Sequence, residues 1–262
     1  MAEDWTDLPP TPNLAEFAVE LPAILEETQH HEIYGVELQA VGEGKPPAHT
    51  TLIILSKFLR ANADDPLKAK EQLSEASKWR KTYRPLDALK ETFSADKFGR
   101  LGYVTTINGA KETKSDKDVV TFNIYGAAAK DPKKSNCTSN EATKPIPDYG
   151  QGPDPYEAVQ VHDYLSVSFF RQPAEVKASS SKIIDLFQRY YPETVSYKYF
   201  VNVPLVMQWM MGTMKALMSK ETVQKMTWMT YGSSLQQYLG DGVPEEYGGI
   251  GPPLSESAMT VV

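Results

Sequence analysis

Strand-like and helix-like segments alternate along residues 99–234, and this order constrains the fold more than any other feature of the chain. The strand-like segments are rich in β-branched and aromatic residues and cover residues 99–107, 118–128, 156–170, 197–204 and 227–234. Two intervening segments, residues 174–193 and 205–226, carry apolar residues at helical spacing. Because strands joined through helices usually lie parallel, we expect an α/β domain with a mixed, largely parallel sheet.

The residues before this region predict a smaller, helical lobe. Apolar residues recur at helical spacing within residues 50–61. A second helix is expected after Asp65, a good N-cap residue that stands directly before Pro66. The predicted division of the chain is a mobile tail at 1–13, a helical lobe at 14–95, the α/β domain at 96–250 and a second tail at 251–262.

Composition and charge exclude several classes of function. The net charge of -7 gives no global basic field of the kind that nucleic-acid-binding proteins use. The acidic start of the chain does not resemble a signal peptide, and no apolar run approaches the roughly 18 residues of a membrane-spanning helix. The single cysteine, Cys137, fits a reducing compartment. We therefore expect a cytoplasmic protein whose membrane contact, if any, is peripheral.

Motifs of catalysis are missing from the sequence. It contains no GxSxG nucleophile elbow and no glycine-rich phosphate-binding loop. Its four histidines, at positions 30, 31, 49 and 162, do not have the spacing of a zinc site. The expectation from these residues is a protein that is not an enzyme.

The stretch VQVHDYLSVSFF, residues 159–170, places polar groups inside an otherwise apolar strand. Side chains two residues apart share a face of a strand, so His162 and Tyr164 should lie together, about 6.6 Å apart along the chain. A hydrogen-bonded pair in the core is one interpretation of this pattern. A binding site on one face of the sheet is the other.

The segment at residues 205–226 is unusually rich in methionine. Met207, Met210, Met211, Met214 and Met218 all lie in it. Methionine is flexible and polarisable, so it suits adaptable binding surfaces as well as ordinary cores. The segment is therefore either core packing or a movable cover over an apolar ligand cavity.

Several stretches resemble the CRAL-TRIO, or Sec-fourteen-like, family of lipid-binding proteins. FLRANADDPLKAKEQLSEASKWR is similar to the helical region of that family, and YYPETVSYKYFVNVP with VPEEYGG is similar to its lipid-binding domain. EIYGVEL, NIYGA, VQVHDY and KYFVNVP are most similar to a fungal phosphatidylinositol-transfer subgroup that binds haem. The resemblance implies a sheet that floors an apolar pocket and a gate helix, starting near Leu205, that covers it.

The resemblance also implies an inositol headgroup site. Glu193 follows Tyr-Pro before a strand, and Thr222 and Lys225 stand three residues apart after the gate, as in the family signature. An ammonium and a hydroxyl suit a phosphate oxygen, and a carboxylate can accept from inositol hydroxyls. Ala158 and Gln160 fall where choline-lipid exchangers carry hydroxyls, so the resemblance does not extend to phosphatidylcholine. From composition alone these charged residues would be surface residues.

In the haem-binding subgroup the HDY motif carries the cofactor site. The resemblance implies that Tyr164 is the axial ligand of the iron of haem b and that His162 tunes it, since a phenolate can ligate ferric haem. It places Tyr125, Lys198 and, less closely, Lys177 near the haem. Residues 129–147 are shorter and more polar than the corresponding segment of the subgroup.

The resemblance thus favours a non-enzymatic phosphatidylinositol transfer protein that also binds haem. The expected partners are phosphatidylinositol, haem and a membrane surface, with peripheral association to endoplasmic reticulum or microsomal membranes and no nucleic acid. The alternative is a haem-dependent oxidoreductase, or a haem sensor or storage protein, with little lipid exchange.

Overall fold

The structure is a computed structural model of the 262-residue chain, and its contacts divide the chain into two compact units. The helical unit comprises residues 1–90, 141–156 and 172–194, and the sheet unit comprises residues 91–140, 157–171 and 195–262. The predicted domain boundaries stay a prediction. The described residues are 11–39, 47–88, 90–91, 99–108, 117–126, 154, 157–167, 174–214 and 220–260.

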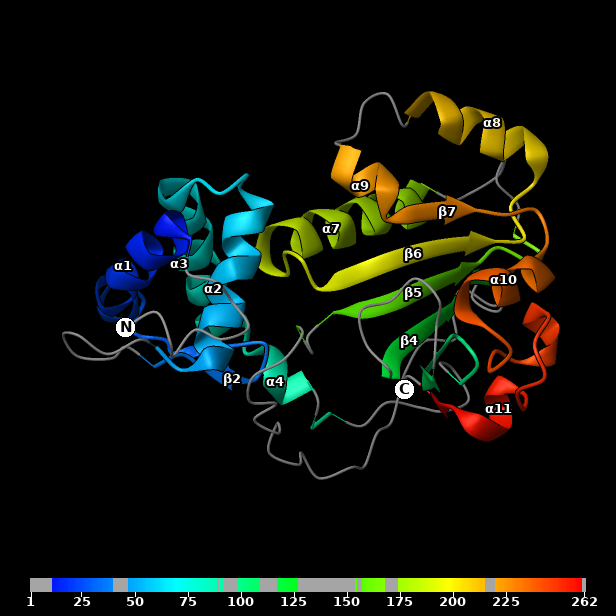
Figure 1. Ribbon diagram of the computed structural model, residues 1–262, viewed down its shortest axis with the longest axis horizontal. Helices are drawn as coiled ribbons and strands as arrows, with labels where there is room; N and C mark the ends of the chain where they lie inside the picture. Colours follow the sequence, from blue (N-terminus) through cyan, green and yellow to red (C-terminus); the bar gives the residue numbers. More distant parts are fainter. Residues whose placement is uncertain are drawn as a thin grey trace. The chain divides into compact units, whose positions relative to one another are not determined.

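Two helices of the helical unit (Figure 1) begin with a capping side chain followed by proline, the pattern that predicted the helix after Asp65. In α1 (Pro12–Thr28) the Thr11 hydroxyl accepts from the backbone N–H of Leu14, and in α3 (Pro66–Tyr83) Asp65 caps the first turn. Proline occupies the first position of both helices. The remaining elements are the hairpin β1 (Glu32–Ile33) and β2 (Val36–Glu37), α2 (His49–Ala61), α4 (Pro85–Ala88) and α7 (Ala174–Tyr190).

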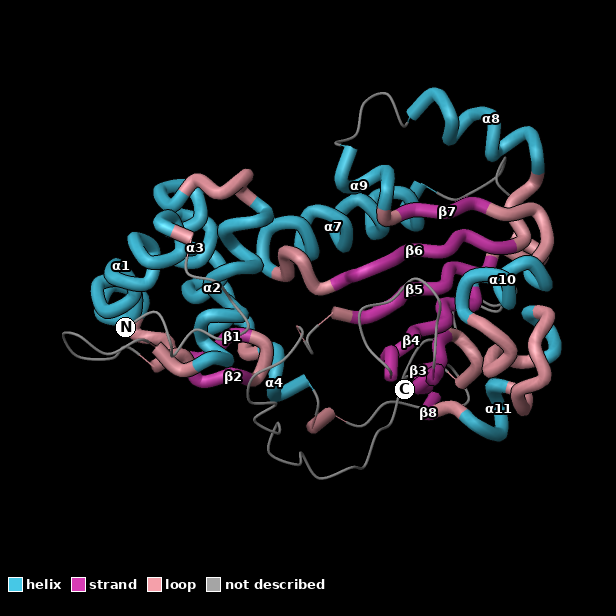
Figure 2. Tube along the Cα trace, in the orientation of Figure 1, coloured by secondary structure: helices cyan, strands magenta, loops and turns pink. Residues whose placement is uncertain are grey.

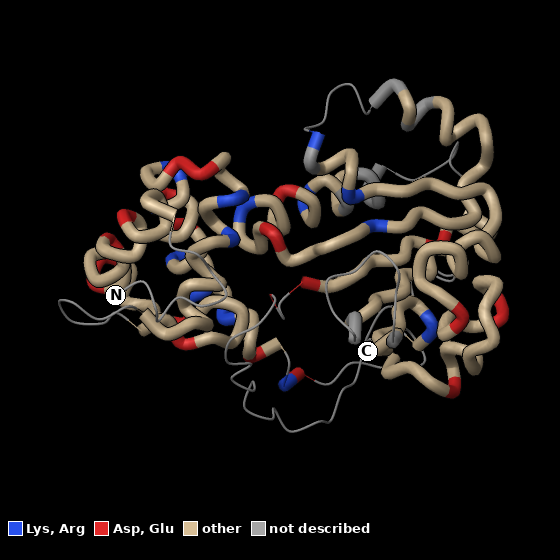
Figure 3. Tube along the Cα trace, viewed as in Figure 1, with Lys and Arg blue, Asp and Glu red and all other residues tan. Residues whose placement is uncertain are grey.

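Opposite charges join α1 to α3. All charged side chains of α1 are acidic, whereas α3 is rich in lysine (Figure 3). Lys70 pairs with Glu20 at 2.6 Å, and Lys78 pairs with Glu27 at 2.5 Å. These pairs are largely exposed, so the stability of the unit comes mainly from the apolar core that α1, α2 and α3 share.

A buried ion pair ties the hairpin to α3. Arg80 is 2% exposed, and its Nε and Nη2 contact the two oxygens of Glu32 at 3.0 and 2.5 Å. Its guanidinium lies beside the stacked rings of Tyr34 and Tyr191, 5.7 and 5.6 Å from their centroids. Arg80 therefore fixes the EIYG hairpin, the end of α3 and the residue after α7 at one point.

The sheet unit contains one large sheet with strand order β7-β6-β5-β4-β3-β8 (Figure 2). Its strands are β3 (Gly102–Asn108), β4 (Lys117–Ile124), β5 (Ala158–Asp163), β6 (Val195–Val201), β7 (Met226–Trp228) and β8 (Met259–Thr260). The pairs β4–β5, β5–β6 and β6–β7 are parallel, and β3 pairs antiparallel with β4 and β8. The expected mixed, largely parallel sheet is confirmed.

One face of this sheet is buried against the end of the chain. Alternate residues of the central strands are fully buried, namely Val120, Phe122, Val159, Val161, Tyr199 and Val201. They pack against a C-terminal layer of η2 (Gly232–Leu235), α10 (Gln236–Leu239), η3 (Glu245–Tyr247) and α11 (Leu254–Ser257).

Two segments near the end of the chain differ from the sequence-based expectation. The strand expected at residues 227–234 ends at Trp228, and a 3₁₀ turn occupies Gly232–Leu235. The segment expected to be a tail from residue 251 contains α11 and β8, and Leu254 is buried in the core of the sheet unit.

We predict that Arg80→Met lowers the free energy of unfolding by about 3 kcal/mol, because the carboxylate of Glu32 loses its buried partner. Urea denaturation measures this change. Lys78→Met, which removes an exposed pair between α1 and α3, should leave the denaturation midpoint close to that of the wild type. Equal midpoints for wild type and Arg80→Met would show that the buried pair contributes little.

Candidate functional site

The second face of the large sheet carries polar and aromatic side chains in two rows. Strand register places Thr121, Gln160, Lys198 and Met226 side by side, and Asn123, His162, Phe200 and Trp228 side by side. We call this surface the polar–aromatic face. It alternates along each strand with the buried residues of the opposite face, as the two-residue period of a strand requires.

Aromatic rings form a continuous row across this face. The ring of His162 stacks on Phe200 with centroids 5.0 Å apart, and Phe200 stacks on Trp228 at 5.2 Å. Tyr125, which follows β4, stacks on His162 at 5.7 Å and contacts Tyr164 at 5.0 Å. His162 and Tyr164 therefore lie on the same side of the sheet, as the strand period predicted.

The imidazole of His162 is held at both nitrogens. Its Nδ1 lies 2.8 Å from the Tyr125 hydroxyl, and its Nε2 lies 3.3 Å from Oε1 of Gln160. An amide oxygen only accepts, so Nε2 carries the proton and Tyr125 donates to Nδ1. Burial, with the nearby charge of Lys198, lowers the pKa of His162 to about 4. The ring is therefore neutral near pH 7.

Burial also sets the protonation of the neighbouring side chains. It raises the pKa of Tyr164, and it raises that of Tyr125 more strongly, so both phenols are protonated near pH 7. It lowers the pKa of Lys198. The polar–aromatic face thus presents one amine and two phenols in a partly desolvated setting.

The turn after β5 is fixed by close packing. The strand expected over residues 156–170 ends at Asp163, because the carboxylate of Asp163 accepts from the backbone N–H of Leu165 at 2.8 Å. Residues 168–170 of that expected strand lie outside the described residues. Gly126 lies against the carbonyl of Leu165, where any side chain would overlap that oxygen. A glycine at this position lets the end of β4, with Tyr125, approach the turn that carries Tyr164.

Asp163 connects this turn to the opposite face of the sheet. It is 6% exposed and accepts from Asn202 Nδ2 at 2.8 Å and from the Tyr247 hydroxyl at 2.9 Å. Asn202 in turn accepts from the backbone N–H of Gly232 at 2.8 Å. The residue between His162 and Tyr164 in sequence therefore anchors the C-terminal layer.

Thr222 and Lys225 lie at the edge of the same unit. Thr222 belongs to α9 (Lys220–Gln224), and its carbonyl accepts from the backbone N–H of Lys225 at 3.2 Å. The carbonyl of Lys225 accepts from the backbone N–H of Lys198 at 2.7 Å. These contacts tie the TVQK segment to β6 beside the polar–aromatic face.

The methionine-rich segment begins with an exposed helix. In α8 (Leu205–Met214), Leu205, Val206 and Trp209 are 71%, 58% and 75% exposed. Gln208 fixes the start of the helix, since its Nε2 donates to the carbonyl of Val203 at 3.0 Å and to the Thr230 hydroxyl at 2.7 Å. Apolar side chains so exposed are not core packing. The side chains of Met210, Met211, Met214 and Met218 lie outside the described residues, so the choice between core packing and a cover for the methionines stays a prediction.

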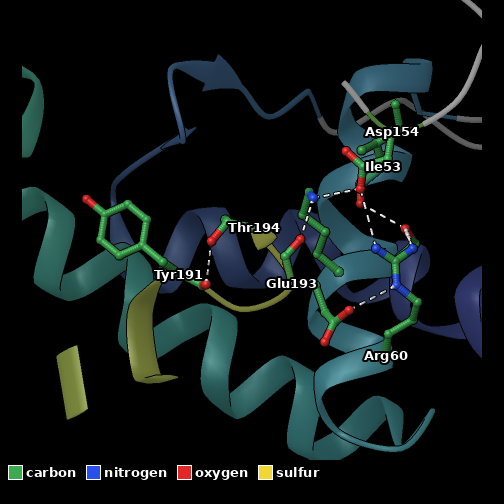
Figure 4. Close-up of polar contacts among 8 residues, drawn as sticks. Ile53, Arg60, Asp154, Tyr191, Glu193 and Thr194 are labelled. Carbon is green, nitrogen blue, oxygen red and sulfur yellow. Dashed lines mark hydrogen bonds and ion pairs between the residues drawn. The ribbon is translucent and has the colours of Figure 1, made fainter. Parts of the chain in front are cut away.

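Glu193 belongs to the helical unit, where it contacts two cations of α2, and Figure 4 shows Arg60 beside it. Lys57 donates from Nζ to the Glu193 carbonyl at 2.7 Å, and Arg60 Nε lies 3.8 Å from Glu193 Oε2. Asp154 pairs with both cations, at 2.6 and 3.4 Å.

The structure thus brings part of the predicted site together. The ring of Tyr125 contacts the rings of both His162 and Tyr164, and Lys198 lies on the same face. Glu193 belongs to the other unit, and the side chain of Lys177, on α7, lies outside the described residues.

Sequence reasoning missed several residues of these surroundings. Phe200 and Trp228 were assigned to strands but not to the site, and Lys57 and Asp154 were not singled out. A lysine within the apolar run TTLIILSKFLRA is a signal that a buried charge with a partner is present.

Comparisons with known proteins place the chain in a family. A model of the CRAL/TRIO domain matches residues 156–249. The "Phosphatidylinositol transfer protein SFH5" of Phaeosphaeria nodorum is 42% identical over 97% of this chain and 81% of its own length. Proteins of the same name from Botryotinia fuckeliana and Sclerotinia sclerotiorum are 43% and 41% identical, but the chain spans only 59% and 63% of their lengths.

A solved structure agrees with these relatives. "Crystal structure of Sfh5" superposes with a TM-score of 0.76 at 25% identity and covers 95% of this chain and 91% of its own. The chain belongs to the CRAL/TRIO family, as its sequence motifs suggested, and its similarity extends to the Sfh5 proteins of fungi.

Two further observations concern only the described part of the chain. No helix there is long and apolar enough to cross a membrane. No cluster of three or more His, Cys, Asp or Glu side chains there has the arrangement of a metal site.

We predict that His162 makes the ligand-free protein less stable as the pH falls from 7 to 5. The unfolded chain binds a proton at His162 near pH 6.5, whereas the folded chain does so only near pH 4, so lowering the pH favours unfolding. Urea titrations at the two pH values should show a smaller loss of stability for His162→Gln than for wild type. Equal losses would mean that His162 is not buried in its neutral form.

Proposed function

We propose that this protein transfers phosphatidylinositol between membranes. The observation that carries this proposal is the 42% identity, over nearly the whole chain, with a protein named phosphatidylinositol transfer protein. The TVQK segment beside the polar–aromatic face supports it, because it supplies a hydroxyl and an ammonium. The function requires binding and release of a lipid and no chemical reaction.

The proposed headgroup residues are Thr222, Lys225 and Glu193, each assigned from the motif in which it lies. The ammonium of Lys225 and the hydroxyl of Thr222 would bind phosphate oxygens, and the carboxylate of Glu193 would accept from inositol hydroxyls. Gln160 stands where a choline-lipid exchanger would carry a hydroxyl, so phosphatidylcholine is not a proposed ligand.

The exposed start of α8 suits the proposed cover of the lipid. Acyl chains must be shielded from water in transit, since each buried CH₂ is worth about 0.8 kcal/mol. Leu205, Val206 and Trp209 form an apolar surface with no charged neighbour in α8, of the kind that enters a membrane interface. We propose peripheral contact with endoplasmic reticulum or microsomal membranes from the cytoplasm.

We also propose that the polar–aromatic face binds haem b. The residues present fit this cofactor: a row of flat rings, the phenol of Tyr164, a neutral imidazole and the amine of Lys198 share one partly desolvated surface. The rings stack on one another, so the row presents ring edges, which suit edge-to-face contact with a flat macrocycle. An amine suits a propionate.

The proposed role of each residue follows from its chemistry. When haem is bound, Tyr164 would hold it by supplying a phenolate oxygen to the ferric iron. The imidazole of His162 is oriented by Tyr125 and Gln160, and its proposed role is to tune that ligand through Tyr125, whose ring contacts both His162 and Tyr164. Lys198 and Tyr125 are the proposed propionate partners, and Lys177 a further one.

We predict that Lys225→Ala lowers the rate of phosphatidylinositol transfer at least about tenfold, the loss of one charged hydrogen bond to the headgroup. Transfer of labelled phosphatidylinositol from donor to acceptor vesicles measures this rate. Lys220→Ala is the matched control, because it removes an exposed lysine from α9, the short helix that ends directly before Lys225. An unchanged rate in Lys225→Ala would overturn the headgroup assignment.

We predict that the protein purified from haem-replete cells shows a visible haem band that Tyr164→Phe shifts or removes. The phenylalanine keeps the ring contacts but cannot supply an oxygen ligand. Tyr231→Phe, at a tyrosine that is 70% exposed, should leave the spectrum unchanged. A colourless wild-type preparation, or one whose spectrum ignores Tyr164→Phe, contradicts the haem proposal.

A further inference from the structure

We propose that Lys57, Arg60 and Asp154 form a positioning cluster that fixes the direction of the Glu193 side chain. The cluster joins α2, residue 154 and the residues directly before β6, which are distant in sequence (Figure 4). The inference rests on the proposed headgroup role of Glu193. In this inference Lys57, Arg60 and Asp154 do not contact the lipid; they act on headgroup binding by orienting Glu193.

The centre of the cluster is the buried ammonium of Lys57. Its side chain is 0% exposed, and Nζ contacts Asp154 Oδ2 at 2.6 Å and donates to the Glu193 carbonyl at 2.7 Å. A buried charge is costly unless it is paired and hydrogen-bonded, and both requirements are met by these contacts. The Glu193 carbonyl is therefore held by a charged donor that has no access to water.

The backbone of Glu193 needs such support. Its φ is +50°, in the left-handed region that non-glycine residues rarely adopt. The adjoining turn is closed by Thr194, whose hydroxyl donates to the Tyr191 carbonyl at 3.0 Å. The backbone of Glu193 is therefore held in one conformation by its φ and by the hydrogen bond from Lys57 to its carbonyl. Because the backbone sets the direction of the Cα–Cβ bond, the side chain leaves the turn in one direction.

Arg60 acts on the carboxylate of the same residue. Its Nε lies 3.8 Å from Glu193 Oε2, and its Nη2 lies 3.4 Å from Asp154 Oδ2. Nη1 contacts the Ser56 hydroxyl at 3.3 Å, and that hydroxyl donates to the Ile53 carbonyl at 2.9 Å. Arg60 is thus held on its own helix while it attracts the carboxylate.

The arrangement is better explained by geometry than by stability. An apolar side chain at position 57 would continue the buried run of Leu52–Leu55 and Phe58, and well-packed apolar groups that replace both partners of a buried ion pair, here Lys57 and Asp154, often cause no loss of stability. The ammonium provides what an apolar group cannot, a fixed donor for the Glu193 carbonyl. We therefore infer that the cluster serves to position the Glu193 carboxylate for the proposed headgroup binding rather than to stabilise the fold.

A double-mutant cycle tests this inference on the full chain. We expect Lys57→Met and Glu193→Ala each to slow transfer of labelled phosphatidylinositol between vesicles about tenfold, and the double variant to be no slower than Glu193→Ala. Residues that act through one another give such non-additive losses, whereas a purely structural defect would multiply with the loss at Glu193. Lys70→Met, which removes a partly exposed ion pair of the same unit, should transfer at the wild-type rate.

The outcomes separate this inference from the proposed function. A folded Lys57→Met that transfers normally, or whose loss multiplies with that of Glu193→Ala, overturns the positioning role alone. Wild-type transfer by Glu193→Ala overturns the headgroup role of Glu193 and this inference with it. If thermal melting shows that Lys57→Met does not fold, Asp154→Asn and Arg60→Gln, the latter at the exposed edge of the cluster, each replace it in the cycle with Glu193→Ala. The same criterion of non-additive losses then tests the positioning role.

Discussion

A buried carboxylate at the end of β5 holds together the segments around the candidate ligand face. Asp163 accepts hydrogen bonds from the turn after β5, from Asn202 after β6 and from Tyr247 in the C-terminal layer. A buried carboxylate is stable only when its oxygens are fully hydrogen-bonded, so these three segments must keep their positions together. Because Asp163 points toward the core, its neighbours His162 and Tyr164 point the other way.

The two faces of the sheet consequently have different roles. The face of Val120, Val159 and Tyr199 is an apolar core closed by the C-terminal layer. The opposite face keeps an imidazole, phenols and an amine whose pKa values are shifted by burial, together with a row of stacked rings. Such a combination is costly in a core and useful in a binding site. The same alternation of side chains along β5 produces both faces.

Local patterns in the sequence were enough for the helix within residues 50–61, the helix after Asp65, the sheet class and the shared face of His162 and Tyr164. They did not predict that β5 stops at Asp163, because the hydrogen bond from the backbone of Leu165 replaces the next step of the strand ladder. The partner of Lys57 is distant in sequence, and one sequence gives no sign of such pairings. Residues 251–260 read as a tail because their short α11 and β8 depend on packing against β3 rather than on local pattern.

The central claim is that the chain carries its ligand in association with the polar–aromatic face. The most direct measurement is mass spectrometry of the full chain in its native state, followed by extraction and identification of what it releases. The account predicts protein that retains one phosphatidylinositol or one haem per chain, with occupancy that falls when Phe200→Ala and Trp228→Ala interrupt the row of rings. Protein that carries neither molecule, or that retains them equally after both substitutions, would contradict it.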